Sequence, residues 1–421
     1  MFAVSSSVHR RLGTVDAAVL GLATVLGAGV FVVWTPAAAA AGPWLLLAVV
    51  LAGIVAACNV TSMADLAAAH PGSGDGFGYG RERLSAGAER LAGLALVVGK
   101  TAAAAAAAGV FGSYVLPSQP LPAAILVIVA VAVLNTAGVR WTVRGAYALV
   151  GGTLTVLLIV IVVGLLGSGG VEVASAAAQE PEPVAVRGGV RGWLCATGLV
   201  FFAFAGYTRV ATLGEEVRDP ARTLRRAVVV TLGVALVAYL LVASALLVGL
   251  GVERLATEPA PLVALVDTGR APALGVLVRV GAAVTAGSAL LSVLVDLSAT
   301  ARAMARNGEL PGAFAVLGTR GTPRWADLTG GLAAIIVAVL AGPVAAIALS
   351  ACSLLVHYGL VNLAALRLPP AQRRWPPWTS WLGLALCASL AVLLPLPQVL
   401  TTAAALAAAW TTATLLSHRP H

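Results

Sequence analysis

Long apolar blocks separated by short polar segments are the dominant pattern of this chain. The blocks are about 20 residues long, the length that an α-helix needs to cross the hydrocarbon core of a bilayer. We do not find the short alternating segments that are typical of a membrane β-barrel, and a helix satisfies its own backbone hydrogen bonds in lipid. We therefore predict an all-α polytopic membrane protein with twelve transmembrane helices, at about 14–41, 43–68, 88–116, 121–138, 141–167, 190–217, 223–251, 273–306, 325–341, 344–366, 378–394 and 397–416.

The composition supports a location in the membrane. The chain has 421 residues, of which 60% are hydrophobic and 10% are charged, whereas soluble domains carry about 25% charged residues. No cleavable signal peptide is expected, because a short polar segment with His9, Arg10 and Arg11 leads directly into the first span. The basic residues are scattered through the loops without interleaved aromatic residues, so the net charge of +9 does not indicate a nucleic-acid partner.

The distribution of basic residues predicts how the chain is oriented. If residues 1–13 are cytoplasmic and the spans alternate in direction, 19 of the 26 lysines and arginines fall in inner segments, 4 in outer loops and 3 within spans. Cytoplasmic loops of membrane proteins are enriched in Lys and Arg in the same way. We therefore predict a multi-pass protein of the cytoplasmic membrane whose C-terminus, 417–421, is also cytoplasmic.

The four cysteines, Cys58, Cys195, Cys352 and Cys387, all fall within predicted spans. Their spacing matches neither a metal site nor a disulfide framework, and packing is the simplest interpretation. We expect neither a bound metal nor a cofactor.

Glycines interrupt two of the predicted spans. Gly27 and Gly29 lie in the first span, within "TVLGAGVF", and Gly206 lies between aromatic residues in the sixth. Glycine lowers helix propensity, and interrupted helices at matching positions in two halves are typical of inverted-repeat transporters. The N-terminus of a half-helix attracts a carboxylate, and freed carbonyl groups can accept hydrogen bonds from an ammonium group. The breaks therefore predict a site for the head group of an amino acid, although such glycines also permit close helix packing.

Five motifs in this sequence resemble those of the amino acid–polyamine–organocation superfamily. "GAGVF" is similar to its first-helix glycine motif, and "FFAFAGYTRVATLGEEVRDPARTL" to its sixth helix and the following inner loop. "HPGSGDGFGYGRERL", "ATARAMARNGELPGAFA" with "GTPRWA", and "LLVHYGLVNLAALRLP" follow the same order, from about residue 12 to 370. The resemblance implies a LeuT-type fold with inverted repeats at 14–167 (helices 1–5) and 190–366 (helices 6–10), followed by helices 11 and 12 at 378–416.

The resemblance also implies which residues bind substrate. The carboxylate would meet the backbone at Gly27, Ala28 and Gly29, and the ammonium would meet carbonyl groups near Val25, Phe202, Ala203 and Ala205. Phe202 and Phe204 would wall or gate the pocket, although packing explains either ring equally well.

Two departures from the family pattern concern charge. Members that take cationic substrates often have an acidic residue in the third helix, where this chain has Gly99, so we expect neutral amino acids to be preferred. The proton-coupled members that are best known carry a lysine in the fifth helix, and "YALVGGTLTVLLI" has none. Lys100, the only lysine in the chain, lies deep in the third span. Because lysine can lose its proton on desolvation whereas arginine stays charged, we predict that Lys100 couples transport to protons. The alternative is that it hydrogen-bonds carbonyl groups of helix one or eight and pins the bundle.

Other polar residues in the spans have no partner that the sequence identifies. Asp296 and Arg209 are charges at membrane depth, where a charge needs a partner. Thr285, Ser288 and Ser292 either line a site for a coupling ion or bond back to their own helix.

These features predict a secondary active transporter, not an enzyme, that takes up amino acids with protons as the coupling ion and the lipid bilayer as its surroundings. Exchange of amino acids or polyamines is the alternative. "GSGD" at 72–75 matches an intramembrane aspartyl protease signature, but Asp75 lies in a Gly-rich loop and has no partner aspartate in a suitable neighbouring span. A non-transporting sensor would usually add a regulatory domain, and a channel would need a continuous polar lining.

Overall fold

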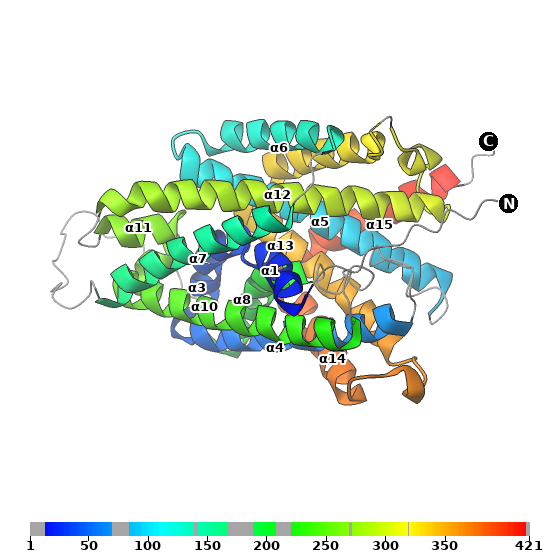
Figure 1. Cartoon of the computed structure of the whole chain (residues 1–421), viewed down its shortest axis with the longest axis horizontal. Coiled ribbons are helices and arrows are strands. Elements are labelled where there is room, and N and C mark those ends of the chain that lie inside the picture. The colour runs from blue at the N-terminus through cyan, green and yellow to red at the C-terminus, as the bar shows by residue number, and fades with distance from the viewer. Residues whose placement is uncertain are drawn as a thin grey trace.

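The computed structural model describes residues 13–69, 84–138, 142–166, 188–207, 220–268, 272–318 and 320–417. Within these ranges the chain is helical and has no strand (Figure 1). Its α-helices are α1 (Thr14–Val25), α2 (Gly29–Val32), α3 (Trp34–Ala41), α4 (Leu45–Ala69), α5 (Ala86–Val115), α6 (Pro120–Thr136), α7 (Val143–Leu166), α8 (Gly189–Phe204), α10 (Pro220–Thr257), α11 (Pro261–Thr268), α12 (Gly275–Arg306), α13 (Arg324–Ala365), α14 (Pro377–Leu393) and α15 (Leu396–Ser417). Short 3₁₀ helices are η1 (Gly42–Trp44), η2 (Ala205–Tyr207), η4 (Pro272–Leu274), η5 (Gly312–Ala315) and η6 (Pro370–Gln372).

In the described part of the chain, eight helices are long and apolar enough to cross a membrane, and the number rises to nine if the bent pair Pro377–Leu393 and Leu396–Leu415 forms one span. The expected number was twelve. Part of the difference lies in α13, which covers the two expected spans 325–341 and 344–366. Gly342 in α13 has a φ of 69° and is followed by Pro343, so the helix is broken between those two spans. The 17-residue α6 is shorter than a typical span.

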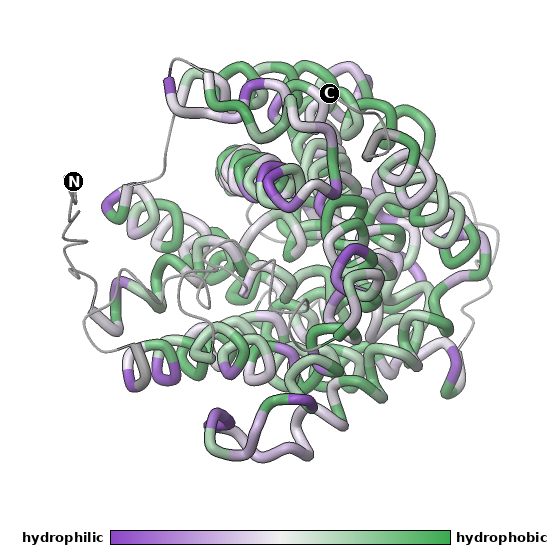
Figure 2. Tube along the Cα trace, turned by 90° about the vertical axis from the view of Figure 1, so that its right-hand side faces the viewer, coloured by the Kyte–Doolittle hydropathy of each residue, from purple (hydrophilic) through white to green (hydrophobic). Residues whose placement is uncertain are grey.

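The outer surface of the bundle is apolar. Leu126, Leu166 and Leu340 are 71%, 76% and 80% exposed, and many other large apolar side chains also face outward. Figure 2 shows hydrophobic residues along most of the helices, with hydrophilic stretches mainly at helix ends and turns. Exposed apolar surface of this extent is typical of a membrane interface. The structure is therefore that of a multi-pass membrane protein.

The core of the molecule is built around α5. Every residue of its alanine run, 102–108, is buried, and α5 packs along both α12 and α13. Figure 1 shows α12 running along the length of the molecule beside α5. Small residues let helix backbones approach closely in a membrane, so the alanine run explains how α5 can contact two neighbouring helices at once.

Two helices are interrupted near this core. The first expected span, 14–41, is divided because α1 ends at Val25 and α2 begins at Gly29, after which Val33 carries the helical backbone from α2 into α3. In the sixth expected span, α8 ends at Phe204 and gives way to η2. The rest of that span, from residue 208, lies outside the described residues. Because α1 and α2 contact η2 and α8 respectively, the two interruptions lie side by side.

Candidate functional site

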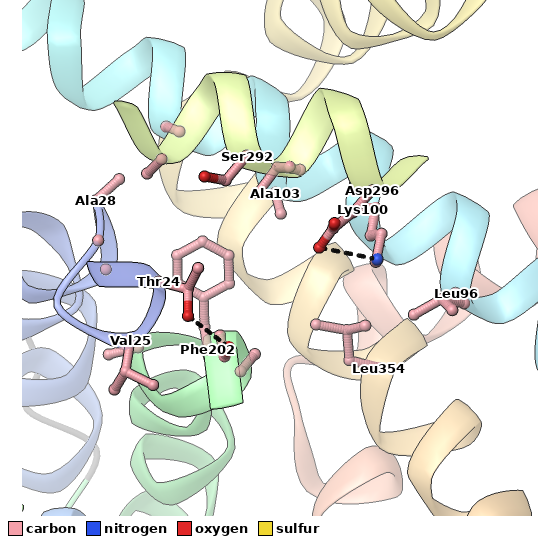
Figure 3. A pocket seen from close by; sticks show the side chains of 18 of the residues that line it. Thr24, Val25, Ala28, Leu96, Lys100, Ala103, Phe202, Ser292, Asp296 and Leu354 are labelled. Carbon is pink, nitrogen blue, oxygen red and sulfur yellow. Dashed lines mark hydrogen bonds and ion pairs between the residues drawn. The ribbon is translucent and has the colours of Figure 1, made fainter. Parts of the chain in front are cut away.

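A cavity of about 100 Å³ lies where the two interruptions meet α5, α12 and α13 (Figure 3). Its walls come from backbone at the breaks, small residues of α5 and α12, and aromatic or aliphatic side chains of α8 and α13. The lining residues are Thr24, Val25, Gly27, Ala28, Gly29, Leu96, Lys100, Ala103, Ala107, Phe202, Ala203, Ala205, Gly206, Ala289, Ser292, Val293, Asp296, Leu354 and Tyr358. Most of the substrate-binding residues that the sequence predicts therefore lie together around one cavity.

The two breaks touch each other, and glycine makes the contact possible. A Cβ atom on Gly29 would lie 2.6 Å from Cα and 2.9 Å from Cβ of Ala203. A Cβ atom on Gly206 would overlap the carbonyl oxygen of Thr24. The hydroxyl of Thr24 donates a hydrogen bond of 2.8 Å to the carbonyl oxygen of Gly206. Gly29 and Gly206 therefore lie at helix interruptions and also allow close packing, so both roles considered for these glycines apply.

Tyr239 of α10 joins the two interrupted helices. Its hydroxyl lies 2.7 Å from the carbonyl oxygen of Val25 and 3.0 Å from that of Ala203, within donating distance of both. These are two of the carbonyl groups that the sequence predicts for the ammonium. A carbonyl oxygen has two lone pairs, so each group keeps capacity for a second donor.

The two phenylalanines predicted to wall or gate the pocket have different surroundings. Phe202 is half-buried and lines the cavity, as Figure 3 shows. Phe204 is fully buried and packs edge-on against Tyr239, with ring centroids 4.9 Å apart. Phe204 does not belong to the cavity lining, so its contacts are those of a core residue.

An ion pair occupies the far end of the cavity from the breaks. Lys100 Nζ of α5 lies 3.4 Å from Asp296 Oδ2 of α12, and Figure 3 shows the two side chains pointing toward each other. Their side chains are 17% and 29% exposed, so both reach the cavity. Asp296 is thus a partner of Lys100 that sequence reasoning did not identify, because the two residues are on separate helices.

The hydroxyl groups of α12 do not act together. Ser288 donates to the carbonyl oxygen of Thr285 in its own helix, and the hydroxyl of Thr285 lies 2.9 Å from that of Thr153 on α7. Ser292 is the member of the predicted set that lines the cavity. Two of the three hydroxyls therefore have helix or interhelix partners instead of a place in the cavity.

Two residues that the sequence singled out are not among those that the structure describes. Arg209 and Asp75, the latter from the protease-like "GSGD", lie in segments outside the described residues. Among the residues that are described, no group of three or more His, Cys, Asp or Glu side chains could hold a metal ion.

The cavity combines polar and apolar surfaces that can bind a small molecule. One end of the cavity presents backbone groups, the middle is lined by Ala103, Ala107 and Val293, and the other end carries one positive and one negative side chain. A mostly apolar cavity with a few polar groups is typical of a small-molecule binding site.

Nearly the whole chain matches a family model, and it is similar to proteins named as transporters. Residues 12–416 match the model of the amino acid permease family. An uncharacterized transporter of Mycobacterium tuberculosis is 42% identical, covering 96% of this chain and 90% of the relative. The methylthioribose transporter of Bacillus subtilis is 28% identical, covering 74% of this chain and 70% of that protein.

A solved structure has the same fold. The crystal structure of a point mutant of the manganese transporter of Eremococcus coleocola superimposes with a TM-score of 0.61 over 96% of this chain and 93% of that one, at 16% sequence identity. This likeness supports the fold, and the family match together with the transporter relatives confirms the resemblance drawn from the motifs. The chain belongs to the amino acid permease family of membrane transporters.

Proposed function

We propose that this protein is a secondary transporter that moves neutral amino acids across the cytoplasmic membrane by proton symport, and that the cavity is its substrate site. One observation carries the proposal: in a chain of the amino acid permease family, a small cavity opens between two interrupted helices whose backbone groups line it. Uncompensated backbone groups at membrane depth are tolerated where they line such a cavity.

The head group of the substrate fits the ends of the broken helices. Helical backbone runs from Gly29 through Val33 to Ala41, and the first N–H groups of a helix have no partner within it. A substrate carboxylate is favoured there by hydrogen bonding and by the helix dipole. Val25, on the α1 side of the break, and Ala203 of α8 both line the cavity, and their carbonyl oxygens are the proposed acceptors for the ammonium beside the Tyr239 hydroxyl.

The fold that goes with this function is a pair of inverted five-helix repeats, 14–167 and 190–366. In this proposed arrangement the interruptions after α1 and after α8 fall in the first helix of each repeat, which is typical of transporters built from inverted repeats. Both termini are assigned to the cytoplasm, in keeping with the excess of arginine in the corresponding loops.

Lys100 is the proposed coupling residue. A lysine can be charged in one conformation and neutral in another, whereas arginine cannot. Its ion pair with Asp296 joins α5 to α12, so a relative movement of these two helices would separate the two charges. Exchange without proton coupling is the alternative mode.

The methylthioribose transporter among the relatives supports a second candidate substrate class. A neutral polar thiosugar would also leave the ion pair of the cavity intact, and it would replace the ammonium and carboxylate contacts with hydroxyl groups. Amino acids and thiosugars would differ in their contacts at the breaks, because only an amino acid carries both an ammonium and a carboxylate group.

A binding panel on the purified protein tests the proposal. Leucine, alanine, arginine, glutamate, putrescine and methylthioribose would be compared for their effect on the melting temperature and for competition against radiolabelled leucine. We expect alanine to compete with labelled leucine and leucine to raise the melting temperature, and the other compounds to be weak. Stabilisation by methylthioribose alone would assign the site to the thiosugar, and stabilisation by putrescine alone would assign it to a polyamine.

A further inference from the structure

The end of the cavity opposite the helix breaks is electrically balanced. Lys100 and Asp296 are the charged members of the lining among the residues that the structure describes. Their charged atoms are 3.4 Å apart, and both side chains are accessible from the cavity. Any molecule that fills the cavity from the breaks to this end therefore meets one positive and one negative group at the same place (Figure 3).

The spacing of residues along α12 brings this pair within reach of the side chain of an amino acid whose head group lies at the breaks. Gly27, at the break, lies against Ala289 of α12, since a Cβ atom on Gly27 would be 3.2 Å from Cβ of Ala289. Asp296 follows Ala289 by seven residues on the same helix, which corresponds to about 10 Å at the rise of an α-helix. An amino acid with its head group at the break would direct its side chain toward the ion pair. A four-carbon stem like that of lysine covers most of the distance.

Neutral walls separate the two ends. Ala103 and Ala107 of α5 and Val293 of α12 offer no charge, and Ser292 offers one hydroxyl group. A charged substrate side chain therefore meets charged groups of the protein only at the ion pair, among the lining residues that the structure describes, and not between the breaks and the pair.

We propose that the Lys100–Asp296 pair determines the charge preference of the transporter, by rejecting both cationic and anionic side chains. This proposal rests on the amino acid transport proposed above. A cationic side chain would compete with Lys100 for Asp296 and lie close to the Lys100 ammonium, and an anionic one would compete with Asp296 for Lys100 and lie close to the carboxylate. Either substrate therefore weakens the ion pair and brings two like charges together, which is unfavourable. A neutral side chain leaves the pair intact, so discrimination arises from repulsion of the wrong substrate as much as from attraction of the right one.

Removing Lys100 and removing Asp296 should shift the substrate preference in opposite directions. An ion pair with only a structural role would not produce this result. Lys100→Met removes the cation and leaves the Asp296 carboxylate without its lysine, so arginine should gain at least about tenfold in affinity relative to leucine, which is 1.4 kcal/mol. Asp296→Asn should shift the preference toward glutamate by a similar factor. Lys100→Arg keeps both charges, and its preference should match that of the wild type.

Competition binding on purified protein tests this without any ion gradient. Radiolabelled leucine is displaced by unlabelled leucine, arginine or glutamate, and ligand-induced shifts of the melting temperature replace the label for any variant that no longer binds leucine. Because no gradient is imposed, loss of proton coupling in a Lys100 variant does not obscure the result. Lys100→Gln is a second neutral replacement in case the methionine variant aggregates.

The outcomes separate this inference from the proposed function. If wild-type protein binds none of the amino acids, the proposed function fails and the inference fails with it. If wild-type protein binds leucine but a monodisperse Lys100→Met or Lys100→Gln variant keeps the wild-type ratio of arginine to leucine affinity, the charge-selection proposal is overturned and the transport proposal stands. Opposite shifts in the Lys100 and Asp296 variants would establish it.

Discussion

Tyr239 connects the two broken helices through a single hydroxyl group. Replacing it with phenylalanine leaves the carbonyl groups of Val25 and Ala203 without this donor. We expect Tyr239→Phe to lower the free energy of unfolding by about 1 kcal/mol and to weaken leucine binding, because the carbonyl groups at the break lose their fixed orientation. Thermal denaturation and equilibrium binding of the purified variant measure both effects.

A matched control is available for the loss of a tyrosine hydroxyl. Tyr147 of α7 is 43% exposed and donates to Asp16 at 3.0 Å. Tyr147→Phe should change neither the melting temperature nor leucine binding beyond experimental error. If Tyr239→Phe and Tyr147→Phe have the same melting temperature and the same leucine affinity, Tyr239 has no role in substrate binding.

Lys100→Arg tests proton exchange at the level of one side chain. The variant keeps a positive charge that can pair with Asp296 but cannot release a proton under physiological conditions. We expect it to bind leucine and to lose accumulation driven by a pH gradient in proteoliposomes, as Lys100→Ala should also do. Arg279→Lys, in the exposed ion pair between Arg279 and Asp267 of α11, is the control and should accumulate leucine normally. A Lys100→Arg protein that still concentrates leucine would rule out proton exchange at this residue.

Single residues also show where sequence reasoning reaches its limit. Lys100 and Asp296 each stand out as charges within an apolar span, but hydropathy gives no distance between two helices, so their pairing was not predicted. Tyr239 was missed although a buried tyrosine hydroxyl generally needs a partner. Its bond to Val25 spans 214 positions in sequence.

At the scale of secondary-structure elements, the direct contact between the two breaks is a testable feature. Gly29→Ala would place a methyl group against the backbone of Ala203, and Gly206→Ala would place one against the carbonyl of Thr24. We expect each substitution to lower the melting temperature and to abolish or strongly weaken leucine binding, because backbone atoms cannot move aside as a flexible side chain can. Gly29→Leu should be more severe for the same reason.

The control for the Gly29 and Gly206 substitutions is a glycine with open space around it. Nothing lies within 4 Å of a Cβ atom on Gly233 in α10. Gly233→Ala should leave binding unchanged and should stabilise the protein slightly, since alanine is favoured over glycine in a helix by up to about 1 kcal/mol. If Gly29→Ala and Gly206→Ala behave like Gly233→Ala, the breaks do not form the compact site described above.

Element boundaries follow hydropathy closely where a helix is long and unbroken. The expected span 88–116 corresponds to α5 (Ala86–Val115), and 121–138 corresponds to α6 (Pro120–Thr136). The eight-residue α11 was not predicted, because a helix of that length is too short to form an apolar block of membrane-spanning size. The breaks themselves were predictable from glycine propensity, whereas their mutual contact depends on how the helices pack.

For the whole molecule, the arginine distribution predicts the sidedness of two exposed turns. Ser118, between α5 and α6, should be extracellular, and Asn307, after α12, should be cytoplasmic; both are exposed. The four native cysteines are buried, so they give little background labelling. In intact cells a membrane-impermeant thiol reagent should label Ser118→Cys and should label Asn307→Cys only after permeabilisation. The reverse pattern would invert the topology.

The most direct test of proton-coupled amino acid transport is the accumulation of radiolabelled leucine by proteoliposomes that contain the wild-type protein. An inward-directed proton gradient should raise internal leucine above the external concentration, and a protonophore should return it to equilibrium. Leucine uptake that is unaffected by the gradient and the protonophore would contradict proton symport, and the absence of any uptake of leucine or alanine would contradict amino acid transport itself.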